Sequence, residues 1–188
     1  MSKIAVLGGT GYLASIIKYQ NFLKKNKYFY FSRKKNSKNY IDYLNFEKNI
    51  SKLKKFDSII YLVGSNKDQI KNEKNLINIK NNITKKICDF CKNNNIKLIY
   101  ISSMQVYKNY GKDNISLNSK INLKDLYARS HYETEKIIFK KFKKDENIFT
   151  ILRLGNVFGY NKNVSLNNFK NNIVHEFCYS AIKKKNIL

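Results

Sequence analysis

Three glycines stand within four residues near the start of a chain that holds only 7 glycines in 188 residues. They follow an aliphatic run over Lys3 to Leu7 and precede the helix-like segment Tyr12 to Ile17, so a buried strand leads through a turn into a helix. The spacing Gly8-x-x-Gly11-x-x-Ala14 suits such a turn, because glycine lets an anion approach the backbone and the helix end is positive. The pattern predicts a turn that binds the pyrophosphate of a dinucleotide; the alternative is an ordinary tight turn.

Strand-like and helix-like segments alternate along the rest of the chain. Further strands are expected at residues 28–32, 40–44, 58–63, 97–101 and 148–154. Helices are expected at residues 46–53, 125–143 and 167–184, and over a segment whose apolar residues are Leu76, Ile79, Ile83, Ile87 and Phe90. Such alternation is typical of parallel βαβ units with right-handed crossovers. We therefore expect an α/β fold, a Rossmann-type doubly wound parallel sheet with strand order 3-2-1-4-5-6.

Length and composition are those of one globular domain. The 188 residues include 43% hydrophobic residues, enough for a core. No run approaches the roughly 18 apolar residues that span a membrane, and the first residues lack the apolar stretch of a signal peptide. Three cysteines do not make a disulfide framework in a chain of this length. We therefore expect a cytoplasmic protein with no membrane partner.

The net charge is strongly positive, at +24 from 37 Lys+Arg against 13 Asp+Glu. A field of this sign attracts polyanions and phosphorylated ligands. The lysines, however, are spread along the whole chain, and the sequence shows neither paired RNA-binding aromatics nor zinc-finger spacing. The pattern argues against nucleic acid as a partner, although a basic nucleic-acid-associated protein on the same fold stays an alternative.

The residues after the second expected strand bear on the choice of cofactor. In a dinucleotide-binding fold an acidic residue here binds the ribose 2′-hydroxyl of NAD, whereas an arginine accommodates the 2′-phosphate of NADP. The segment Ser32 to Lys35 contains no acid and contains Arg33, in a chain where arginine is rare. We expect NADP or NAD as cofactor, with NADP slightly favoured by Arg33; the alternative is that Arg33 is one more surface cation.

Five segments, in this order and at these spacings, carry a resemblance to a known family. They are Gly8-Gly9-Thr10-Gly11-Tyr12-Leu13-Ala14, residues 57–64 (Asp-Ser-Ile-Ile-Tyr-Leu-Val-Gly), residues 100–107 (Tyr-Ile-Ser-Ser-Met-Gln-Val-Tyr), residues 127–136 (Tyr-Ala-Arg-Ser-His-Tyr-Glu-Thr-Glu-Lys) and residues 152–159 (Leu-Arg-Leu-Gly-Asn-Val-Phe-Gly). Together they resemble the extended short-chain dehydrogenases/reductases, the NAD(P)-dependent epimerases and dehydratases of nucleotide sugars. The resemblance extends over nearly the whole chain.

The resemblance implies roles for single residues. The implied cofactor-binding residues are Gly8, Thr10, Gly11, Tyr12, Leu13, Asp42, Tyr43, Leu62, Val63 and Gly64, with Asp42 and Tyr43 beside the adenine. The implied catalytic residues are Ser103, which binds the reacting oxygen, Tyr127, which acts as the base, and His131. Asn156 is the implied contact to a nucleotide-sugar substrate, and Asn78 is loosely matched to an asparagine near the active site.

Position 131 departs from the pattern of the family. A tyrosine, with a pKa of about 10, is a weak base at neutral pH, and a lysine one helical turn later lowers that pKa and binds the nicotinamide ribose. In this chain His131 stands in place of that lysine. A neutral imidazole can hydrogen-bond a ribose but supplies little charge near pH 7, which predicts reduced activity with an altered pH profile, or none. The alternative register, Tyr132 to Lys136, has the same spacing but displaces the matches around it.

The family also has a smaller carboxy-terminal lobe that completes the sugar site. We expect an NAD(P)-binding Rossmann domain at residues 1–160, and at 161–188 only the start of such a lobe. The expected function is that of an NAD(P)-dependent epimerase, dehydratase or reductase acting on a nucleotide sugar, impaired by the shortened lobe and by His131. The alternative is an NADP(H)-binding protein without turnover. By analogy, a homodimer is expected through the helices that contain Asn78 and Tyr127.

Two other patterns have a simpler explanation. Cys88 and Cys91, with His175 and Cys178, have the composition of a four-ligand zinc set. Both pairs fall on expected helices, which favours buried apolar cysteines, and no metal is expected. Arg153 either contacts a substrate phosphate or, as we rather expect, stabilises the end of its strand.

Overall fold

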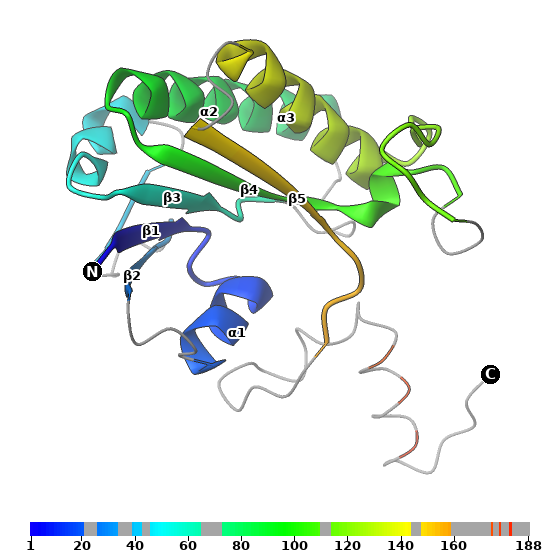
Figure 1. Cartoon of the computed structure of the whole chain (residues 1–188), viewed down its shortest axis with the longest axis horizontal. Helices are drawn as coiled ribbons and strands as arrows, with labels where there is room; N and C mark the ends of the chain where they lie inside the picture. Colours follow the sequence, from blue (N-terminus) through cyan, green and yellow to red (C-terminus); the bar gives the residue numbers. More distant parts are fainter. Residues whose placement is uncertain are drawn as a thin grey trace.

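The chain folds into five parallel strands flanked by helices in the computed structural model of the protein (Figure 1). The structure describes residues 1–20, 26–33, 39–42, 46–64, 73–109, 114–143, 148–158, 174, 177 and 181. The sheet has the order β2-β1-β3-β4-β5. The expected Rossmann-type α/β fold is therefore confirmed, and the five strands have the order that the sequence predicts for them.

The strands are short, and β1, β3 and β4 in the middle of the sheet are more deeply buried than β2 and β5 at its described edges. They are β1 (Lys3–Leu7), β2 (Lys27–Phe31), β3 (Ser58–Tyr61), β4 (Lys97–Ser103) and β5 (Phe149–Leu154). The expected strand at 58–63 thus ends at Tyr61, and the one at 97–101 continues to Ser103. This extension matters for function, because it makes Ser103 the last residue of a rigid strand.

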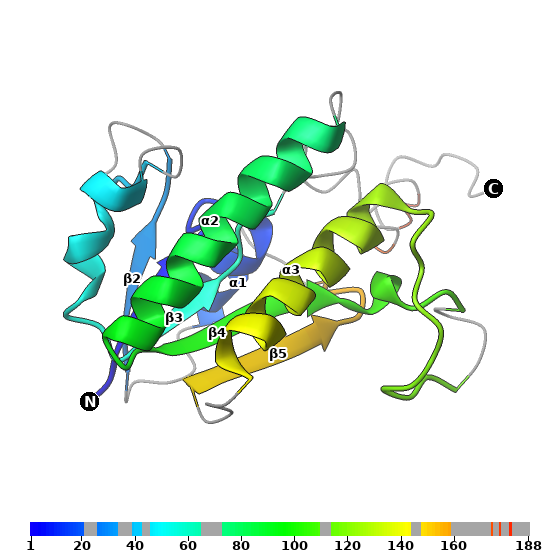
Figure 2. The same cartoon turned by 90° about the horizontal axis from the view of Figure 1, so that it is seen from above.

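Helices cover both faces of the sheet. Helix α1 (Tyr12–Gln20) lies on one face, while α2 (Glu73–Asn93) and α3 (Leu126–Phe142) lie side by side on the other (Figures 1 and 2). Short 3-10 turns are η1 (Phe46–Lys48), η2 (Ile50–Leu53) and η4 (Met104–Val106). Within the described residues, no helix combines the length and the apolar character that crossing a membrane requires.

Two expected elements between β2 and β3 differ in the structure. The expected strand at 40–44 is a single parallel bridge between Ser32 and Tyr40, beside β2 where strand order 3-2-1 would place it. The Ile41 N–H donates to the Ser32 carbonyl at 2.9 Å, and residues 43–45 lie outside the described part. The expected helix at 46–53 is divided into η1 and η2, which the buried side chains of Phe46 and Leu53 attach to the core.

Helix α2 presents a different face from the one predicted. Ile79, expected in the core, is 40% exposed, whereas Ile77 and Lys80 are buried. The reason is tertiary, because α2 packs against α3 as well as on the sheet and therefore turns its first half toward α3. The prediction was correct further along the helix, where Ile83 and Ile87 lie in the core.

The expected tail helix at 167–184 and the domain division at residue 160 fall almost wholly outside the described residues. Of that tail, the structure describes residues 174, 177 and 181, which are helical. The division into two domains therefore stays a prediction.

Candidate functional site

The carboxyl ends of parallel strands share one edge of the sheet, which is where such folds bind ligands. The parallel pairing of the strands places most of the predicted site residues that the structure describes at this edge. The turn after β1, the end of β2, the turn after β3 and the end of β4 supply Gly8 to Leu13, Arg33, Leu62 to Gly64 and Ser103. Asn156 is exposed two residues beyond β5, and Tyr127 reaches the same edge from the first turn of α3.

The β1–α1 turn is tied to its neighbouring strands. Gly8 has a φ of +93°, a left-handed conformation that favours glycine, so the tight turn predicted at Gly8 is confirmed. The N–H groups of Gly8 and Gly9 donate to the Phe31 carbonyl at 3.2 and 2.8 Å. The Gly11 N–H donates to the Gly8 carbonyl at 3.0 Å, and a Cβ on Gly8 would lie 3.1 Å from the Leu62 backbone carbon. Both β2 and β3 therefore confine the turn.

Gly9 is a glycine whose role the sequence reasoning missed. A Cβ at Gly9 would lie 2.7 Å from Tyr30 Cβ and 2.9 Å from the Phe31 backbone nitrogen, so a side chain there requires β2 to move. A Cβ at Gly11 would instead meet the Gly8 carbonyl oxygen at 3.3 Å. Gly9 thus serves the fold, and Gly11 leaves space beside the start of α1. The doubled glycine in a glycine-poor chain was the available signal.

The residues around this turn form a partly open surface. Ala14 is fully buried against the sheet, as its small size predicts, while Thr10 is exposed and Tyr12 and Leu13 are half-buried. Across from them, Leu62 and Val63 are half-buried, and Gly64 is exposed. A Cβ on Gly64 would have no atom of the described residues within 4 Å. Among the described residues of the two turns, Thr10, Gly11 and Gly64 are therefore the exposed positions.

The residues expected near the adenosine part of the cofactor lie beside the end of β2. Arg33 is exposed directly after the Ser32–Tyr40 bridge. Asp42 is half-buried on the adjoining segment. Tyr43, expected with Asp42 beside the adenine, lies outside the described residues. Arg33 is thus positioned near the turn with its side chain accessible, as a contact to a phosphate requires.

Ser103 and Tyr127 meet at the end of β4. The Ser103 hydroxyl accepts from the Gln105 N–H at 3.2 Å and is hydrogen-bonded to the Tyr127 side chain. Asp125 caps α3 by accepting from the Ala128 N–H at 2.8 Å, which fixes Tyr127 in the first turn. Burial raises the pKa of Tyr127, the hydrogen bond with Ser103 opposes this rise, and Asp125 adds to it. The tyrosine is therefore protonated at neutral pH.

His131 lies one helical turn beyond Tyr127 and points between α3 and the sheet. It is 8% exposed, and its ring centre is 4.6 Å from that of Tyr127. Its Nδ1 lies 2.7 Å from the Tyr100 hydroxyl, and the two rings stack with centres 5.9 Å apart. Burial, and secondly the charge of Lys80, lower the pKa of His131 well below 6.5. The imidazole is thus neutral at pH 7, with Nδ1 already bound to Tyr100.

The alternative register has a different environment. Tyr132 is half-buried, and Lys136 is exposed with Nζ 5.3 Å from the centre of the Tyr132 ring. Ser103 is hydrogen-bonded to Tyr127. The geometry therefore favours Tyr127 over Tyr132 as the tyrosine of the candidate site.

Lys80 is a second residue that the sequence reasoning missed. Asn78, the residue matched on the basis of the resemblance, is exposed, whereas Lys80 is 8% exposed on the face of α2 toward α3. The Lys80 ammonium donates to the Ser130 hydroxyl at 3.1 Å and lies 5.8 Å from the centre of the Tyr100 ring. Burial lowers its pKa from 10.5 to about 7, against an opposing effect of Glu135. A lysine within an apolar helical stripe was the available signal.

Arg153 ties β5 to α3. Its Nε and Nη2 donate to the two carboxylate oxygens of Glu135 at 2.9 and 2.5 Å, and Ser102 Oγ donates to the same carboxylate at 2.5 Å. The guanidinium also lies 4.6 Å from the centre of the Tyr107 ring. Glu135 raises the pKa of Arg153, mainly through the hydrogen bonds. These contacts support the structural role expected for Arg153 at the strand end.

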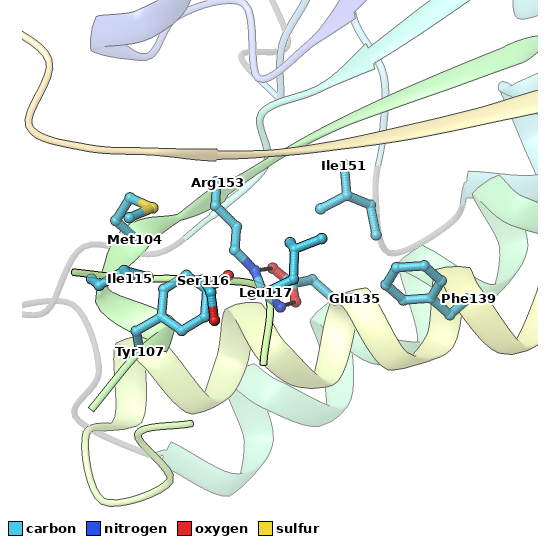
Figure 3. Close-up of a pocket in the computed structure, with 9 residues that line it drawn as sticks. All are labelled: Met104, Tyr107, Ile115, Ser116, Leu117, Glu135, Phe139, Ile151 and Arg153. Carbon is cyan, nitrogen blue, oxygen red and sulfur yellow. Dashed lines mark hydrogen bonds and ion pairs between the residues drawn. The ribbon is translucent and has the colours of Figure 1, made fainter. Parts of the chain in front are cut away.

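A cavity of about 440 Å³ lies beside this ion pair. In Figure 3 the side chains of Arg153 and Glu135 point toward each other between β5 and α3. The cavity is lined by Met104, Tyr107, Ile115, Ser116, Leu117, Glu135, Phe139, Ile151 and Arg153. Its lining is mostly apolar, and the two charged residues that line it, Arg153 and Glu135, bind each other.

The cysteine pair is buried in the core. Cys88 and Cys91 are free thiols on the sheet-facing side of α2. Burial raises the pKa of Cys88 to about 12 and also raises that of Cys91, which disfavours the thiolate needed for metal or redox chemistry. Their suggested partners, His175 and Cys178, lie outside the described residues, and within the described part no cluster of three or more ligating side chains could hold a metal.

A family model and several solved structures match the chain. Residues 4–188 match the model of the NAD dependent epimerase/dehydratase family. No curated protein matches the sequence. The UDP-N-acetylglucosamine 4-epimerase of Bacillus cereus is 22% identical, with a TM-score of 0.75 over 100% of this chain and 64% of that one.

Two further structures resemble the fold over 99% of this chain. The ADP-L-glycero-D-manno-heptose-6-epimerase of Helicobacter pylori is 18% identical, with a TM-score of 0.78 and 64% of its length covered. The dTDP-glucose 4,6-dehydratase of Bacillus anthracis, solved in complex with NAD, is 15% identical, with a TM-score of 0.76 and 63% covered. The chain thus spans less than two thirds of the length of these structures.

Proposed function

The chain belongs to the NAD-dependent epimerase/dehydratase family, and from this premise we propose that it binds NAD(P) at the β1–α1 turn and acts on a nucleotide sugar. The observation that carries the proposal is the meeting of this turn with the Ser103–Tyr127 pair at one edge of the sheet. The named activities of the structural neighbours, epimerases and a dehydratase of nucleotide sugars, support the substrate class.

The residues at the turn fit the pyrophosphate of such a cofactor. Gly11 and Gly64 are exposed and carry no side chain that a pyrophosphate would meet, and α1 starts directly behind Gly11 with its positive end. Arg33 would approach a 2′-phosphate, so we propose NADP as the slightly preferred cofactor. When bound, the cofactor would accept a hydride from a carbinol carbon of the sugar and return it.

The catalytic roles follow from the positions of three side chains. Ser103 would donate a hydrogen bond to the reacting sugar oxygen, and Tyr127 would remove the proton from that hydroxyl. Because the pKa of Tyr127 is raised in the structure, positive charge must arrive before the tyrosine can act as a base at neutral pH. His131 would contribute a hydrogen bond to the nicotinamide ribose through Nε2, since Nδ1 is bound to Tyr100.

Binding can be tested by calorimetric titration of the chain with NAD and with NADP. We expect both to bind, and Gly11→Ala to weaken binding by about tenfold or more, because its Cβ would occupy the space of the pyrophosphate. Gly155→Ala is the matched control: a Cβ there has no atom of the described residues within 4 Å, so affinity should not change. Cofactor binding would be refuted if neither NAD nor NADP gave a heat of binding.

Turnover can be tested separately with Tyr127→Phe. The variant loses the hydroxyl that takes the proton but keeps the ring against His131. We expect kcat on a nucleotide sugar to fall by roughly 10²–10⁴-fold with an unchanged Kd for NAD(P). Equal turnover by Tyr127→Phe and the unsubstituted chain would exclude Tyr127 as the base.

A second candidate function is binding of NADP(H) without turnover. The observation that favours it is the pair of protonation states at the site: Tyr127 is held protonated and His131 is held neutral. The two candidates share cofactor binding and differ only in turnover. Cofactor binding combined with no measurable reaction of any nucleotide sugar would favour the second.

A further inference from the structure

Two buried basic side chains face each other between α2, α3 and β4. Lys80 projects from α2 and His131 from α3, and each is 8% exposed. Tyr100 of β4 contacts both, because its hydroxyl lies 2.7 Å from His131 Nδ1 and its ring centre 5.8 Å from Lys80 Nζ. The Lys80 ammonium also donates to the hydroxyl of Ser130, the residue that precedes His131. The two bases therefore contact the same tyrosine, one at its ring face and the other at its hydroxyl.

The other charged and titratable groups around the two bases come from three elements. They are Tyr61 on β3, Tyr100 on β4, and Tyr127 and Glu135 on α3. The Glu135 carboxylate is occupied by Arg153 and Ser102. The Lys80 ammonium therefore lacks a direct carboxylate partner among the described residues, and its contacts are the Ser130 hydroxyl and carbonyl and the Tyr100 ring.

Two positive charges in such a site repel each other strongly, because the surrounding core screens them poorly. Lys80 retains a hydroxyl, a carbonyl and an aromatic face that each favour an ammonium. His131 has its Nδ1 on a tyrosine hydroxyl, which can donate to a neutral ring. The contacts therefore favour placing the single positive charge on Lys80.

We propose that Lys80 is a positioning residue of the Tyr127 site: it carries the one positive charge of the two bases, on α2 rather than at position 131, and thereby keeps His131 neutral against Tyr100. This charge division, with the positive charge on Lys80 and a neutral imidazole at His131, is argued from the contacts alone. Its consequence for catalysis rests on the proposed function. The pKa of Lys80, lowered by burial to about 7, agrees with a charge present below neutral pH.

The charge division can be measured in the chain without cofactor. The protein has only 2 histidines, His131 and His175, so two imidazole signals are expected in a heteronuclear NMR titration and His175→Gln assigns them. In Lys80→Gln we expect the titration midpoint of His131 to rise by roughly one pH unit, because the opposing charge is gone. Lys80→Arg keeps the charge and should leave the midpoint of His131 as in the unsubstituted chain.

Lys85→Gln is the matched control, since Lys85 is exposed on the same helix and its loss should leave His131 unchanged. An unshifted His131 midpoint in folded Lys80→Gln would overturn the proposal. Should that variant not fold, thermal unfolding of His131→Lys and His131→Gln replaces it: a second ammonium beside Lys80 should lower Tm more than the amide does. Equal Tm values for the two would also contradict the proposal.

The proposed function fails by a different measurement. A shifted His131 midpoint together with no NAD(P) binding refutes the proposed function and supports the charge division. NAD(P) binding together with an unshifted His131 midpoint supports cofactor binding and refutes the charge division.

Discussion

Replacing Glu135 by alanine is expected to destabilise the domain by about 3–5 kcal/mol. Glu135 is 1% exposed and accepts from Arg153 and Ser102 at once, so its removal leaves a largely buried guanidinium without a counter-charge. The loss is measured as the change in the free energy of unfolding from urea denaturation followed by circular dichroism. Because the Arg153–Glu135 ion pair joins β5 to α3, we expect the circular dichroism signal of the variant to change in a single cooperative transition at lower urea concentration.

Two further variants separate the unpaired charge from the lost contact. Glu47→Ala removes one member of an exposed ion pair with Lys86 and should cause no comparable loss. The double variant Glu135→Leu with Arg153→Met replaces the buried pair by apolar groups and should recover most of the stability. A double variant as unstable as Glu135→Ala would show that the charge left on Arg153 is not the cause.

Replacing Lys80 by methionine is expected to remove a pH dependence of stability. Folding lowers the pKa of Lys80 from 10.5 to about 7, so between these pH values the unfolded chain binds one proton more than the folded chain. Stability therefore rises with pH through this window and falls as the pH drops toward 7. From pH 6 to pH 9, the titration of Lys80 should raise the free energy of unfolding by about 2–3 kcal/mol, and Lys80→Met should lack this rise.

The measurement is urea denaturation of the two proteins at several pH values from 6 to 9. We expect the difference in unfolding free energy between Lys80→Met and the unsubstituted chain to favour the variant at pH 6 and to shrink toward pH 9. Lys85→Met, an exposed lysine on the same helix, should follow the unsubstituted chain at every pH. Parallel curves for Lys80→Met and the unsubstituted chain would rule out a lowered pKa at Lys80.

Local patterns were sufficient for much of the fold and for part of the candidate site. The aliphatic and aromatic runs predicted all five strands, and the glycine spacing predicted the tight turn at Gly8. The segment 40–42 was harder, because whether it makes a strand or a single bridge depends on its pairing with β2. The exposure of Ile79 was also missed, since helical periodicity does not include the packing of α2 on α3.

In the candidate site, too, some residues were predictable from sequence motifs and others only from the packing of distant elements. Ser103 and Tyr127 were predicted from their motifs, and the structure brings them together, while their roles stay predictions. Lys80 could not be assigned, because its relation to His131 joins residues 51 positions apart on two helices. In a chain with 37 basic residues, composition does not indicate which lysine is buried.

The order of the residues alone determined the succession of strands and helices and the tight turn after β1. These features depend on neighbours within one or two turns of the backbone, where steric and periodic preferences act directly. Only the tertiary structure decided which of many lysines is buried and which carboxylate holds Arg153. The pKa of a buried group depends on desolvation and on charges brought near it by other elements, and neither exists until the chain has packed.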